Sequence, residues 1–109
     1  MLFLAELDRV TPDAPMTPEA GRAFIEQVIF PTIARAEELL AGGVIVAGGP
    51  VAGRVALKFV LQAENAEHAD RLITSLPLWL VAETRVTPLI TFAERREHVQ
   101  ELLTNLRGG

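Results

Sequence analysis

Cysteine is absent from the 109 residues, which excludes disulfide bonds and thiolate chemistry. Long apolar runs are absent too: none approaches the roughly 20 residues that a membrane-spanning helix requires. Charged residues at Glu6, Asp8 and Arg9 interrupt the first apolar stretch, which is unlike a secretory leader. We therefore expect a soluble, cytoplasmic protein with no membrane partner.

The sequence also lacks a basic run. The formal net charge is −4, from 14 acidic and 10 basic residues, so we expect no nucleic-acid partner. The two histidines, His68 and His98, fall in separate predicted helices and form no HxH or HExxH motif. We therefore expect no bound metal.

Half of the residues are hydrophobic, enough for one core in a single domain. Alternation and turn signals predict strands over residues 2–10, 44–47, 54–62 and 82–92. Periodicity predicts helices over residues 18–41, 65–75 and 93–106. The order βαββαβ is that of ferredoxin-like α+β folds, with both crossover helices on one face of a four-stranded antiparallel sheet.

Capping and breaking signals define the first two helices. Thr17 followed by Pro18 predicts a helix start, and Asn65 predicts another. Pro31 removes a hydrogen bond, so we expect a kink or a break near residues 29–30. The apolar residues of the first helix form one stripe that we expect to face the core: Phe24, Ile25, Val28, Ile29, Ile33, Leu39 and Leu40.

A glycine-rich segment, GGPVAG, spans residues 48–53. It could cradle a phosphate if a helix followed. An alternating strand follows instead, so a β-hairpin is the favoured interpretation. The strand predicted over residues 82–92 contains Pro88, which we expect at an edge, a bulge or a strand end.

The spacing of apolar residues among charged ones over residues 93–106 predicts a helix with one apolar side. The segment AERREH is best interpreted as a solvated surface with pairs such as Glu94 with His98. We expect residues 1–92 to form the α+β domain and residues 93–109 a C-terminal helical extension that docks on a partner subunit. The apolar side consists of Val99, Leu102, Leu103 and Leu106.

Residue parity predicts which side chains share a face of the sheet. The set expected to meet the helices is Phe3, Ala5, Leu7, Val55, Leu57, Phe59, Leu61, Val86, Ile90 and Phe92. The opposite, open face mixes apolar Leu2, Leu4, Ala56, Val60 and Leu89 with charged Glu6, Asp8, Lys58, Glu83 and Arg85. Such a mixture predicts a homodimer that buries the apolar members and encloses the charged ones in a polar pocket.

The opening MLF strand, the element spacing and the motif LPLW at residues 76–79 resemble the muconolactone isomerase family of dimeric α+β barrels over about residues 1–92. This resemblance implies a cofactor-free isomerase that moves a double bond in a small unsaturated lactone acid during aromatic-compound breakdown. It also implies homodimers assembled into larger oligomers. Leu4 stands where the family often has a polar residue, and tyrosine is absent, which argues against muconolactone itself as substrate.

Proton transfer from carbon requires a base and a group that stabilises the resulting negative charge. The candidate bases are Glu6 and Asp8. The candidate binding groups for a substrate carboxylate or lactone are Lys58, Arg85, Arg54 and Trp79.

Two alternatives remain open. The charged residues can instead be ion pairs in a dimer interface, and Trp79 can be packing only. The protein would then be a non-catalytic ligand-binding or assembly protein of the same fold. A cofactor-independent monooxygenase has less support, because no histidine lies on the predicted open face.

Overall fold

The computed structural model describes residues 1–12 and 14–108. Its strands are β1 (Leu2–Arg9), β2 (Ile45–Pro50), β3 (Ala56–Gln62) and β4 (Ala82–Leu89). Its helices are α1 (Pro18–Phe24), the π-helix η1 (Ile25–Ile29), α2 (Phe30–Ala41), α3 (Ala66–Thr74), the 3-10 helix η2 (Pro77–Val81) and α4 (Phe92–Gly108). Among these helices, none is both long and apolar enough to cross a membrane.

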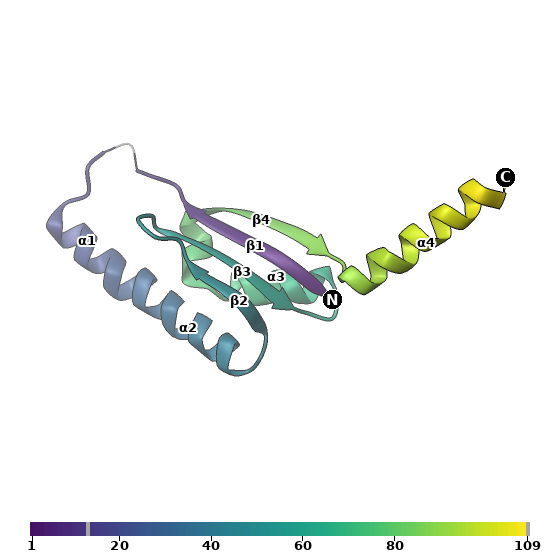
Figure 1. Ribbon diagram of the computed structural model, residues 1–109. Coiled ribbons are helices and arrows are strands. Elements are labelled where there is room, and N and C mark those ends of the chain that lie inside the picture. The colour runs from purple at the N-terminus through teal and green to yellow at the C-terminus, as the bar shows by residue number, and fades with distance from the viewer. Residues whose placement is uncertain (13, 109) are drawn as a thin grey trace.

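The strands form one antiparallel sheet in the order β2-β3-β1-β4 (Figure 1). β1 is therefore central and flanked by β3 and β4, as the predicted βαββαβ arrangement requires. The α1–α2 segment and α3 supply core residues to one face of this sheet. The ferredoxin-like α+β fold is confirmed.

Alternation along the two central strands separates the faces as parity predicts. Phe3, Ala5 and Leu7 of β1 are buried, and each residue between them is only half-buried. In β3 the buried set on the same face is Leu57, Phe59 and Leu61, which pack with Leu39, Ala69, Ile73 and Leu76 of the helical layer. Because the two strands pair with Ala5 opposite Phe59, these side chains form one continuous apolar layer.

The first helix starts and breaks where the sequence predicts. The Thr17 side chain accepts a hydrogen bond from the Ala20 N–H at 3.1 Å. Near Pro31 the helix widens into η1, in which the Phe30 N–H donates to the Ile25 carbonyl, five residues back. Pro31 has no N–H group to donate to the regular hydrogen-bond ladder of the helix. The wider π-turn just before it accommodates this interruption. The predicted irregularity at residues 29–30 is confirmed.

This wider turn also changes which side chains reach the core. The expected single stripe is wrong for Ile25, Ile33 and Leu40, which are 46%, 40% and 57% exposed. A π-turn holds one extra residue and so rotates everything that follows around the helix axis. Thr32 and Leu39 are the buried residues of α2 instead.

The β2–β3 hairpin is confirmed, with a bulge between Ile45 and Ala47. Just after the bulge, Gly48 has φ +106°. A Cβ atom there would lie 2.3 Å from the Lys58 carbonyl oxygen and 2.5 Å from the Phe59 Cα. Only glycine fits this close approach of two backbones. β2 consequently extends to Pro50, past the predicted end at residue 47.

The C-terminal end of β4 differs from the prediction. The strand stops at Leu89, with Pro88 at its end opposite Phe3. Ile90 and Phe92 do not face the helices, because both lie outside the strand and are 52% and 94% exposed. Helix α4 begins here, earlier than the alternation pattern suggests.

A capping box explains the start of α4. The Glu94 N–H donates to Thr91 Oγ1, and the Thr91 N–H donates to Glu94 Oε1, both at 3.0 Å. These hydrogen bonds from Thr91 lower the pKa of Glu94. The expected Glu94–His98 pair is therefore replaced, and the His98 ring lies 3.4 Å from Arg95. α4 then projects away from the rest of the molecule (Figure 1), and none of its residues is buried.

Candidate functional site

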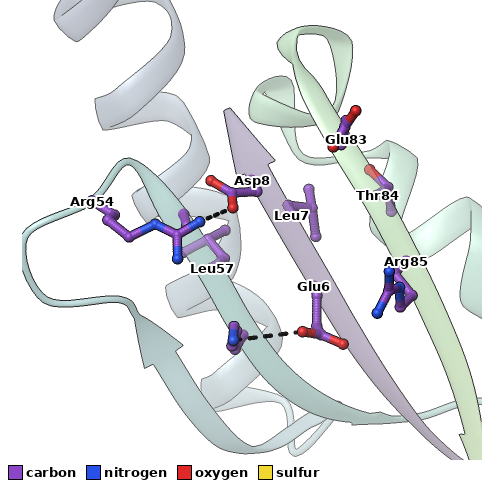
Figure 2. A pocket seen from close by; sticks show the side chains of 10 residues that line it. Glu6, Leu7, Asp8, Arg54, Leu57, Glu83, Thr84 and Arg85 are labelled. Atoms are coloured by element: carbon purple, nitrogen blue, oxygen red, sulfur yellow. Dashed lines mark hydrogen bonds and ion pairs between the residues drawn. The ribbon is translucent and has the colours of Figure 1, made fainter. Parts of the chain in front are cut away.

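A hollow of about 440 Å³ lies on the open face of the sheet (Figure 2). Its lining residues come from β1, β3, β4 and the turn before β3: Glu6, Leu7, Asp8, Arg54, Ala56, Leu57, Lys58, Glu83, Thr84 and Arg85. The structure thus brings together five of the six predicted site residues. The hollow contains three acidic and three basic side chains, so its formal charge is balanced.

Glu6 occupies the centre of this arrangement. In the sheet register it lies opposite Lys58 on β3 and opposite Arg85 on β4. Directly opposed residues have Cβ atoms about 5 Å apart, within reach of long charged side chains. One carboxylate is thereby placed between two cations by backbone pairing alone.

The Glu6 carboxylate pairs with Lys58, with Oε2 and Nζ 3.6 Å apart. Its side chain is 28% exposed, whereas those of Lys58 and Asp8 are 57% and 48% exposed. Glu6 is therefore the more sheltered of the two predicted bases. The long ion-pair distance leaves the contact easy to exchange for a bound anion.

Asp8 lies nearer the hairpin and is held by Arg54 (Figure 2). Arg54 precedes β3 and follows Gly53, whose φ of +78° turns the chain back toward the sheet. The prediction of a strand beginning at residue 54 is wrong, because β3 starts at Ala56. Arg54 nevertheless reaches the open face and forms an ion pair with Asp8.

Arg85 and Glu83 complete the hollow from β4. Glu83 lies opposite Asp8, which sets two carboxylates side by side across the strands. Within residues 1–12 and 14–108, neither Arg85 nor Glu83 has an ion-pair partner. Arg85 is therefore a cation of the hollow that remains available for a ligand.

Glu83 belongs to the predicted open-face set but not to the predicted site. Its parity, which it shares with Arg85, was sufficient to include it. Thr84, Leu7 and Leu57 also line the hollow, although their parity assigns them to the helical face. Parity alone has no signal that could include them.

Trp79 does not line the hollow, as far as the described residues show. It lies on η2 and is 39% exposed, while its neighbours Leu76 and Leu78 are buried. The Leu78 N–H donates to the buried Thr32 hydroxyl at 3.0 Å, which ties η2 to α2. In this structure the LPLW motif anchors the helical layer to the end of the sheet.

The two ends of the open face differ in character. The charged hollow occupies the end near the hairpin. At the other end lie half-buried Leu2, Leu4 and Val60, with Leu89 36% exposed. Leu4 pairs opposite Val60, and Leu2 opposite Leu89, so the four side chains form one apolar patch.

The chemistry of the hollow is that of a carboxylate among cations. It can hold a small anion and can move a proton, because a sheltered carboxylate lies next to two positive groups. Within the described ranges, no three His, Asp or Glu side chains are grouped to hold a metal ion.

Comparisons with known proteins agree with this picture. The family profile described as muconolactone delta-isomerase matches residues 1–95. No curated protein sequence matches the chain significantly.

Solved structures share the fold. A crystal structure of muconolactone isomerase superposes with a TM-score of 0.67 at 23% identity, covering 84% of this chain and 90% of that one. The 5-chloro-2-hydroxyhydroquinone dehydrochlorinase of Burkholderia phenoliruptrix AC1100, in complex with 2,5-dihydroxybenzoquinone, superposes with a TM-score of 0.61 at 19% identity. It covers 86% of this chain and 98% of the other. Identities this low show a common fold.

Proposed function

The chain belongs to the muconolactone delta-isomerase family, and from this premise we propose that it is a cofactor-free isomerase. Its substrate would be a small carboxylated or lactone-type acid formed in the breakdown of aromatic compounds. The observation that carries the proposal is the position of Glu6, a sheltered carboxylate between Lys58 and Arg85 in a 440 Å³ hollow.

The reaction requires only proton movement. Glu6 removes a proton from a carbon next to the substrate carbonyl, and the electron pair of that C–H bond forms a new C=C bond. The former C=O π-pair becomes negative charge on oxygen, beside a cation. The enolate is conjugated with the existing C=C bond of the unsaturated substrate. As the C=O bond re-forms, the new C=C pair shifts one position along the carbon chain, and the electron pair of the original C=C bond takes the proton back from Glu6 at a carbon two positions further on. The substrate keeps all its atoms, the double bond changes place, and no redox partner is involved.

Each charged residue has a distinct proposed role. Arg85, which has no ion-pair partner among the described residues, binds the substrate carboxylate by a bidentate contact. Lys58 leaves its loose contact with Glu6 to stabilise the enolate charge. Arg54 holds Asp8 in place, which makes Asp8 the less available base.

The proposal includes a homodimer in which two open faces cover each other. The apolar patch of Leu2, Leu4, Val60 and Leu89 would be buried by this contact. The charged hollow would then be enclosed, and exclusion of water strengthens every electrostatic interaction within it. The face of a lone protomer leaves the hollow open to solvent.

The test is exchange of substrate protons in deuterated water, followed by NMR over a panel of unsaturated lactone acids. The native protein should incorporate deuterium and convert at least one member. Glu6→Gln should slow both processes by about 100-fold or more, because general-base catalysis is worth roughly that factor.

Glu83→Gln is the matched control. It removes a carboxylate from the same hollow and should keep most of the activity. Equal losses in the two variants would show that charge balance matters rather than a base at Glu6. Absence of exchange across the whole panel with native protein would contradict the isomerase.

A further inference from the structure

An apolar cavity of about 190 Å³ lies between the β2–β3 hairpin and the helical layer, and we call it the side cavity. Its apolar walls come from η1, α2, the hairpin and η2, mainly through Ile29, Ile33, Pro50, Val55, Leu57 and Leu78. An apolar cavity of about 150 Å³ can hold a benzene molecule. The side cavity therefore has room for a hydrocarbon group of that size.

The polar residues of the side cavity already have partners in the protein. They are Thr32 and Arg54. The Thr32 hydroxyl accepts a hydrogen bond from the Leu78 N–H at 3.0 Å, and the Arg54 guanidinium forms an ion pair with Asp8. The remaining walls are hydrocarbon, so the space suits an apolar group.

Part of this apolar wall is poorly covered by the protein itself. Val55 and Ile33 are 37% and 40% exposed, whereas Leu57 and Leu78 are buried. Covering exposed aliphatic surface with an apolar group is favourable. Ile29 is the last residue of the π-helix η1, and π-turns occur frequently at functional sites. These features favour a ligand site over a simple packing gap.

The side cavity adjoins the charged hollow. Arg54, Ala56 and Leu57 line both spaces, and they lie at the start of β3 or just before it. The hollow offers cations to a carboxylate, and the side cavity offers apolar walls. Together they suit a molecule with an anionic end and an apolar end.

Arg54 lies at the boundary between the two spaces. Its guanidinium reaches Asp8 over the hollow (Figure 2), and its side chain is 55% exposed. Of the other two shared residues, Ala56 has a short side chain and Leu57 belongs to the core. Arg54 is therefore the shared residue whose long side chain can move without disturbing the core.

We propose that the side cavity binds an apolar substituent of the substrate, of up to about the size of a phenyl ring, while the carboxylate of the same molecule binds in the hollow. Arg54 is then a specificity-determining residue, because its side chain limits passage between the two spaces. This inference rests on the proposed function for the carboxylate end, but it concerns which acids bind and not how they react.

Binding of unreactive acids tests the proposal without turnover. The probes are the phenylalkanoates from phenylacetate to 5-phenylpentanoate, each compared with the alkanoate of the same chain length that lacks the ring. Isothermal titration calorimetry on the native full-length protein measures the dissociation constants. The ring should tighten binding by about tenfold or more at one preferred chain length, because it buries apolar surface only when it reaches the cavity.

The outcomes separate this inference from the isomerase. Equal affinities with and without the ring would overturn the side cavity and leave the isomerase proposal intact. Absence of binding by every acid would contradict both the side cavity and the anion-binding role of the hollow. Proton exchange in deuterated water remains an independent measure of the reaction.

Two substitutions in the hairpin locate the ring. Val55→Phe fills the side cavity and should remove the tenfold gain, while the ringless acid binds as before. Val46→Phe is the matched control, because Val46 is 48% exposed on β2 and does not line the side cavity within the described chain. Circular dichroism confirms that each variant is folded. Equal losses in the two variants would overturn the assignment of the ring to this cavity.

Two further residues test the two ends of the ligand. Arg85→Met should weaken the acids with and without the ring by a similar factor, because it removes only a carboxylate contact. In Arg54→Ala the path between the two spaces is more direct, so the preferred chain should become shorter. Arg54→Lys keeps a long side chain and should retain the native preference. An unchanged preference in folded Arg54→Ala would overturn the role given to Arg54.

Discussion

The two faces of the sheet are built from alternate residues of the same strands but depend on different interactions. Lys58 and Phe59 are neighbours in β3, yet Phe59 is 4% exposed in the core and Lys58 lies at the open hollow. The helical face is held by burial of apolar surface, and its residues determine stability. The open face carries partly exposed ion pairs, of which the contact between Glu6 and Lys58 is long, and its charged residues line the hollow. One strand can therefore serve the fold and the site independently.

Truncation on the helical face should have the largest effect. Phe59→Ala removes a buried aromatic ring from the centre of the core and should lower the free energy of unfolding by about 3–5 kcal/mol. Chemical denaturation followed by circular dichroism measures the change. A loss below about 1 kcal/mol would show that this face does not depend on close packing.

The bulge in β2 lets the backbone of Gly48 approach β3 closely, and Gly48→Ala tests how much this close approach contributes to stability. The new Cβ meets the backbone of Lys58 and Phe59, and φ is +106°. We expect a loss of about 2–3 kcal/mol from the left-handed backbone and the clash together. Gly49→Ala is the matched control, because nothing lies within 4 Å of its added Cβ. Equal effects of the two substitutions would contradict the role given to the bulge.

On the open face, Lys58→Met should affect turnover strongly and stability little, whereas Phe59→Ala affects stability strongly. Its ion pair with Glu6 is long and solvated, so the free energy of unfolding should change by less than about 1 kcal/mol. Turnover of the substrate found by proton exchange should fall by about 100-fold, because a charge-stabilising group is lost. A strongly destabilised or dissociated protein with normal turnover would instead favour a structural ion pair.

The smallest effect concerns α4, which belongs to neither face. The Thr91 hydrogen bonds lower the pKa of Glu94 from its usual 4.5. A depressed pKa in the folded state means that the carboxylate stabilises the cap above that value, and that this contribution is lost as the pH falls through the lowered pKa. The start of α4 should fray as the pH falls below the usual glutamate pKa of 4.5 and through the lowered pKa of Glu94, seen as faster amide exchange. Thr91→Ala should fray at neutral pH, and Glu94→Gln should lose most of the pH dependence.

Local patterns in the sequence were enough to predict the order of the elements and which residues of β1 share a face of the sheet. Alternation in β1 and β3 places Glu6, Asp8 and Lys58 together, because period-two geometry leaves a strand residue only two directions. Thr17 and Asn65 correctly predicted where two helices start. In the structure their side chains accept hydrogen bonds from the N–H groups of Ala20 and His68. Such features depend on neighbours within a few residues.

The remaining features depend on contacts between segments that are distant in the sequence, and local patterns do not encode them. The register between β1 and β4 sets Arg85 beside Glu6, 79 positions apart in the chain. The π-turn before Pro31 rotates Ile33 and Leu40 out of the core, and η2 packs on Thr32 and leaves Trp79 away from the hollow. The periodicity of apolar residues does not show which side of a helix faces the core once a π-turn has added a residue. Nor does it show from which edge of the sheet a helix departs. Residue type and alternation therefore predicted five of the residues that line the hollow, and long-range packing set their partners and added the others.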